Sequence, residues 1–167
     1  MNKIVGIRTL NKAITEAFSS ITDVKFRWAE DWAFHYDKNM VTYALLENTI
    51  EDIWFNAFVE ERFGYKVENN FMMTIMHELG HYVTGDDIDG MVYEFCLKEK
   101  TRISEEMQTA DAERSKELEW QYFNLPDEIV ATAWAVEFMT KEAEDVEAIW
   151  QKVLEALHKF YEKNITE

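Results

Sequence analysis

Cysteine, proline and glycine are scarce in this chain. Its 167 residues include one cysteine (Cys96), one proline (Pro126) and five glycines. A single cysteine excludes an intramolecular disulfide, and a chain without disulfides fits the reducing cytoplasm. Because glycine and proline interrupt helices and strands, their scarcity predicts long regular elements.

Long apolar runs are absent as well. No stretch approaches the roughly 20 apolar residues that cross a bilayer, and the N-terminus lacks the apolar segment of a signal peptide. We therefore expect a cytoplasmic protein without a membrane partner.

Positive charge is the third shortage. The chain has 17 lysines and arginines against 33 acidic residues, a formal net charge of −16. Such a surface repels nucleic-acid phosphates and attracts basic protein segments. We expect no direct nucleic-acid partner, and basic segments in any protein that the chain binds.

The hydrophobic content of 47% is ample for a core, and the length suits a single domain over residues 1–167. Apolar and polar residues alternate in the region 22–46, which predicts a small antiparallel sheet. Helical periodicity follows, with helices at about 69–84 and 126–141 and a C-terminal helix at about 144–163. These patterns predict an α+β fold that is mainly helical. Between the first two of these helices, residues 91–121 predict one or two polar helices, with Val92, Phe95 and Cys96 on an apolar face.

The sequence from His77 to His81, His-Glu-Leu-Gly-His, is an H-E-x-x-H motif within a predicted helix. Residues four apart lie on the same helix face because a turn takes 3.6 residues. Both imidazoles can therefore bind one cation, and Glu78 lies close enough to reach a water beside it. Zinc hydrolases use this arrangement.

A catalytic zinc usually takes three protein ligands and keeps one position open. Because His35 falls in the strand region and His158 near the C-terminus, a carboxylate is the expected third ligand. The candidates are Asp89 in the loop after the motif, Glu94 on the next helix, and Glu128 at the start of a later apolar helix. Glu128 is favoured, since a carboxylate on an inward helix face needs a partner.

The sequence leaves alternatives open for the oxyanion donor and for the metal. Glu78 is the expected general base, and the donor to the oxyanion is Tyr82, Tyr93 or Tyr122. Manganese or iron could occupy a site of two histidines and one carboxylate. The motif could also belong to a structural zinc site or to a semi-exposed helix.

The motif and a later segment together resemble the ImmA/IrrE family of metallopeptidases. After H-E-x-x-H, that family has a helix of the pattern E-x-x-A-x-x-(aromatic)-A-x-x-(two apolar). This chain matches it from Glu128 onward, with Ala131, Trp134, Ala135, Phe138 and Met139. Thr132 stands where the family usually has asparagine.

The resemblance implies metal ligation by His77, His81 and Glu128, and catalysis by Glu78. It implies a cytoplasmic zinc metalloendopeptidase whose substrate is a specific protein, such as a repressor of a phage, of another mobile element or of a stress regulon. The alternative is an acidic binding or inhibitory protein that mimics nucleic acid and carries a vestigial or structural metal site.

Overall fold

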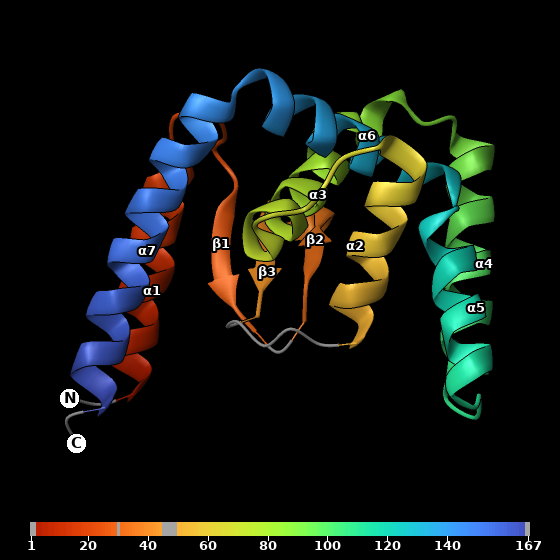
Figure 1. Cartoon of the computed structure of the whole chain (residues 1–167), viewed down its shortest axis with the longest axis horizontal. Helices are drawn as coiled ribbons and strands as arrows, with labels where there is room; N and C mark the ends of the chain where they lie inside the picture. The colour runs from red at the N-terminus through yellow and green to blue at the C-terminus, as the bar shows by residue number, and fades with distance from the viewer. Residues whose placement is uncertain (1–2, 30, 45–49, 166–167) are drawn as a thin grey trace. The chain divides into compact units, whose positions relative to one another are not determined.

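The computed structural model describes residues 3–29, 31–44 and 50–165, and Figure 1 traces their course. Residues 1–45 and 139–167 form one compact unit, and residues 46–138 form a second. Mostly helical elements with a small sheet confirm the predicted α+β class. A single domain over 1–167 stays a prediction. No helix in the described ranges is long and apolar enough to span a bilayer.

The first unit combines two long helices with a three-stranded sheet. Helix α1 (Lys3–Phe18) packs along α7 (Ala143–Ile165), which matches the C-terminal helix predicted at 144–163. The contact buries one apolar stripe of each helix, which includes Leu10, Ile14, Val153 and Leu157.

The sheet contains β1 (Lys25–Trp28), β2 (Ala33–His35) and β3 (Met40–Tyr43), in the order β1-β3-β2. The antiparallel prediction is right for β2 and β3 but wrong for β1, which pairs with β3 in parallel. The central position suits β3, whose last three residues are all buried. Residues 45 and 46, the end of the predicted sheet region, lie outside the described residues.

Helix α1 covers the free edge of β1 through two polar side chains one turn apart. Thr15 Oγ1 accepts a hydrogen bond from the Phe26 amide at 3.0 Å. Asn11 Oδ1 accepts from the Trp28 amide at 2.7 Å. Edge-strand amides left unpaired would otherwise invite pairing with another chain, so these side chains complete the sheet edge.

The second unit consists of α2 (Ile50–Phe63), α3 (Asn70–Thr84), the short 3₁₀ helix η2 (Gly85–Asp87), α4 (Gly90–Met107), α5 (Ala112–Phe123) and most of α6 (Pro126–Lys141). The bounds of α3 and α6 agree with the predicted helices at 69–84 and 126–141. Asn69 caps the start of α3, because its side chain accepts a hydrogen bond from the Met72 amide at 3.0 Å. Pro126 opens α6, where a missing N–H costs nothing.

Helix α4 differs from prediction in the face that it buries. Cys96 packs with Ile103 and Leu118 in a small buried cluster. Val92 and Phe95, expected on the same face, are exposed instead. The buried stripe therefore continues from Cys96 toward the C-terminal half of α4, where α5 packs against it.

Candidate metal site

Helix α3 is buried around most of its circumference, and both motif histidines lie within it. His77 is 6% exposed and His81 is 9% exposed. One helical turn separates them, and their ring centroids lie 4.8 Å apart. The prediction that both imidazoles leave one helix face is confirmed.

Helix α6 brings Glu128 to this pair from 47 positions beyond His81. Glu128 Oε2 lies 3.0 Å from His77 Nε2, and Oε1 lies 3.4 Å from His81 Nε2. Their ligand atoms all fall within 4.8 Å of one another. Among the described residues, this is the one group of three or more potential ligands found this close together.

The competing carboxylates lie elsewhere. Asp89 is exposed and accepts a hydrogen bond from the Met91 amide at 2.9 Å, so it caps the start of α4. Glu94 is exposed on α4. Neither belongs to the group formed by the two histidines and Glu128.

Gly80 allows α3 and α6 to approach closely enough for this contact. A Cβ added at Gly80 would lie 2.8 Å from Ala131 Cα, closer than real side chains come. Gly80 lies between the two histidines in sequence, and Ala131 lies one turn after Glu128. The glycine thus places the backbone of α6 directly against the motif.

Thr132 orients the first histidine. Its hydroxyl lies 3.0 Å from His77 Nδ1, and the residue is 1% exposed. With Nδ1 donating to Thr132, Nε2 is the ring nitrogen left to bind a metal ion. Such a second partner commonly fixes the tautomer and direction of a metal-binding histidine.

Lys100 on α4 was not predicted as part of the site. Its ammonium group lies 2.6 Å from Asp127 Oδ2 and also contacts Glu128 Oε1. Burial lowers the pKa of Lys100, but the Glu128 carboxylate outweighs this effect, so the pKa is raised and the side chain stays charged. In sequence it is one of two lysines on α4, with Lys98, and only the packing of α4 distinguishes it.

The charges of His77, His81 and Glu128 influence one another strongly. Burial raises the pKa of Glu128, but His81 and His77 outweigh it and hold that pKa well below its ordinary value of 4.5. Burial likewise lowers the pKa of His81, and Glu128 outweighs it, so the pKa rises above 6.5. Without a metal, a proton on His81 therefore helps to balance the charge of Glu128.

Three buried carboxylates surround this region, those of Glu78, Asp127 and Glu128. Lys100 supplies one compensating charge, which leaves an excess of two negative charges. A divalent cation would balance that excess, and two imidazoles with one carboxylate form a donor set that zinc accepts. The residues present therefore fit a divalent metal.

One of the three candidate tyrosines is coupled to these charges. Tyr122 on α5 is partly buried, and burial followed by the Glu128 and Glu78 carboxylates raises its pKa. Lys100 Nζ lies 5.2 Å from the centre of its ring. Tyr82, by contrast, is 38% exposed. The charges around His77, His81 and Glu128 therefore also act on Tyr122.

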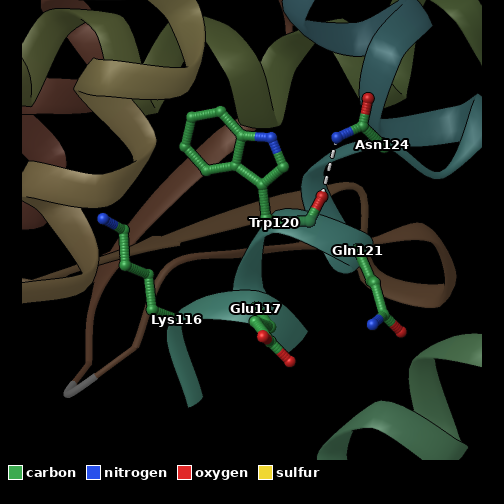
Figure 2. A pocket seen from close by; sticks show the side chains of 5 residues that line it. All are labelled: Lys116, Glu117, Trp120, Gln121 and Asn124. Atoms are coloured by element: carbon green, nitrogen blue, oxygen red, sulfur yellow. Dashed lines mark hydrogen bonds between the residues drawn. The ribbon is translucent and has the colours of Figure 1, made fainter. Parts of the chain in front are cut away.

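A separate cavity of about 430 Å³ runs along α5 (Figure 2). Trp120 forms one wall and packs edge-on against Phe58 of α2, with ring centroids 5.5 Å apart. Asn124 Nδ2 donates to the Trp120 carbonyl at 2.8 Å. The other lining residues are Lys116, Glu117 and Gln121. None of His77, His81 and Glu128 lines this cavity.

Comparisons with protein-family models, with curated proteins and with solved structures find no match for this chain. The class of the site therefore comes from its geometry: a buried two-histidine, one-carboxylate group on two packed helices.

Proposed function

We propose that this chain is a zinc-dependent metallopeptidase. The observation that carries the proposal is the buried convergence of His77, His81 and Glu128, with Glu78 next to the first histidine. These three side chains would hold the ion and leave one position open, as catalytic zinc sites do.

Glu78 has the position of a general base. Its side chain is 8% exposed, and it is not part of the ligand group. A bound zinc ion would supply a water of lowered pKa and polarise the substrate carbonyl. Glu78 would accept the proton of the attacking water and return it to the leaving amine.

Tyr122 is our candidate for stabilising the oxyanion. A phenol kept protonated by its raised pKa can donate a hydrogen bond, and donors aimed at developing charge contribute strongly to catalysis. Lys100 would hold Glu128 and Asp127 in place through its ion pairs.

The substrate we propose is a specific cytoplasmic protein. The H-E-x-x-H motif and the Glu128 helix resemble the ImmA/IrrE metallopeptidases, which makes a phage, mobile-element or stress-regulon repressor a reasonable candidate. The net charge of −16 favours a substrate with basic segments.

The test is cleavage of a peptide library derived from cytoplasmic proteins, read by mass spectrometry of new termini. Zinc-loaded wild type should cleave, and Glu78→Gln should keep its zinc and lose cleavage. Glu94→Gln, which removes an exposed carboxylate outside the group, serves as the matched control and should stay active. Equal cleavage by Glu78→Gln would refute the mechanism.

The alternative, an acidic binding protein, rests on the same net charge. It predicts a pure protein that contains no stoichiometric metal, stays inactive after zinc addition and binds a basic partner. Zinc-dependent cleavage would contradict it.

A further inference from the structure

The first unit contains a cavity of about 400 Å³ with two arginines on its walls. Ile7, Arg8 and Asn11 line it from α1, and Arg27 and Trp28 line it from β1. No acidic residue is among these lining residues. A positive cavity is unexpected in a chain with nearly twice as many acidic as basic residues.

Neither arginine is paired with a carboxylate of the described residues. Within the described ranges, no ion pair joins Arg8 or Arg27 to a carboxylate. On α1, the positions three and four residues from Arg8 carry no acid. On the sheet, Arg27 pairs with Thr42 of β3 rather than with an acidic residue. Both side chains are exposed, and among the described residues no carboxylate competes with a ligand for their guanidinium groups.

Asn11 adds a fixed polar group to the same cavity. Its Oδ1 accepts from the Trp28 amide at 2.7 Å and from the Tyr43 hydroxyl at 2.8 Å. These two bonds orient the carboxamide and leave its Nδ2 group without an acceptor among the described residues. Two N–H donors therefore remain beside the arginines.

We propose that this cavity binds a small phosphomonoester that carries a flat ring, the chemistry of a nucleoside monophosphate. Two guanidinium groups match a dianionic phosphate in charge and in their paired N–H geometry. The half-buried indole of Trp28 offers an apolar face on which a ring can stack. The volume lies within the range of small-molecule sites.

The ligand is small because the rest of the molecule repels polyanions. A nucleic-acid strand would bring many phosphates close to a chain of net charge −16. A ligand with a single phosphate interacts mainly with the nearby positive charges of Arg8 and Arg27. The site does not depend on the metal group or on peptidase activity, since its residues all belong to the first unit.

The test uses calorimetric titration of the full chain with AMP, adenosine and inorganic phosphate. AMP should bind at least tenfold more tightly than adenosine or phosphate alone. Arg8→Gln and Arg27→Gln should each weaken AMP at least tenfold, because each removes charge-assisted hydrogen bonds. The Asn11 side-chain amide signals should shift in NMR spectra when AMP is added.

The matched control is the double variant Lys12→Gln, Lys25→Gln. It removes two positive charges from the same helix and strand, but neither lysine lines the cavity. It should bind AMP within about threefold of wild type. Equal weakening in this control, unchanged binding in the arginine variants, or no binding of AMP at millimolar concentration would overturn the proposal.

Discussion

Thr132 shows how much of the site depends on a single side chain. The sequence indicated only that threonine stands where the helix of the family that it resembles usually carries asparagine. In the structure its hydroxyl lies 3.0 Å from His77 Nδ1. The two residues are 55 positions apart, and only the packing of α6 against α3 brings them together. Sequence spacing alone could therefore not show that Thr132 orients His77.

Replacing Thr132 by valine keeps the shape and removes the hydroxyl. We expect Thr132→Val to bind zinc about ten- to a hundredfold more weakly, the usual cost of losing the second partner of a metal-binding histidine. Thr132→Ser should retain most of the affinity. Thr101→Val, on the exposed face of α4, is the control. Competition with a chromogenic chelator measures the affinity, and equal affinity in the valine variant would contradict the assigned role.

The coupled pKa values of His81 and Glu128 predict a pH dependence for the metal-free protein. The pKa of His81 is raised in the folded state, so its contribution is present below 6.5 and is lost as pH rises through the folded value. The pKa of Glu128 is lowered, so its contribution is present above 4.5 and is lost as pH falls through the folded value. Both contributions are therefore present between these two ordinary values.

Urea denaturation of metal-free protein across this pH range measures the effect. The free energy of unfolding should fall as pH rises above 6.5 in wild type, and His81→Gln should show a smaller fall. If the free energy of unfolding changes with pH in the same way in both proteins, His81 is not the cause of the pH dependence. Because protons and metal compete for the histidine, zinc affinity should also rise over the same interval.

At the scale of elements, the site is a contact between α3 and α6. The periodicity of both helices and the inward position of Glu128 were predictable from sequence. The closeness of the two backbones was not, since it comes from Gly80 meeting Ala131. The role of Lys100 was not predictable either. The sequence of α4 predicts only a polar helix, and its packing in the fold is what brings Lys100 to Asp127 and Glu128.

Gly80→Ala should force the two helices apart. Overpacking of this kind costs about 1–3 kcal/mol, against which alanine gains up to about 1 kcal/mol in helix propensity. We expect a net loss of stability together with weaker zinc binding, because Glu128 moves away from the histidines. Thermal melts and chelator competition measure both effects.

Gly90→Ala is the matched control for this substitution. Gly90 begins α4, and a Cβ there meets nothing within 4 Å. Its melting temperature and zinc affinity should stay the same or rise slightly. If Gly80→Ala behaves like this control, the close helix contact is not what holds the site together.

At the scale of the whole molecule, composition and periodicity were enough to predict a mainly helical α+β chain. They missed the parallel pairing of β1 with β3, because strand order depends on which distant segments meet rather than on local alternation. The arginine-lined cavity was not predictable either, because its residues come from two separate segments, α1 and β1. A net charge of −16 describes the molecule as a whole and hides a local positive site.

A metal ion held by His77, His81 and Glu128 can be counted by elemental analysis of purified wild type, Glu128→Ala and Asp89→Ala. We expect about one zinc per chain in wild type and in Asp89→Ala, and a large loss of zinc in Glu128→Ala. Wild type without metal, or zinc kept by Glu128→Ala and lost by Asp89→Ala, would contradict it.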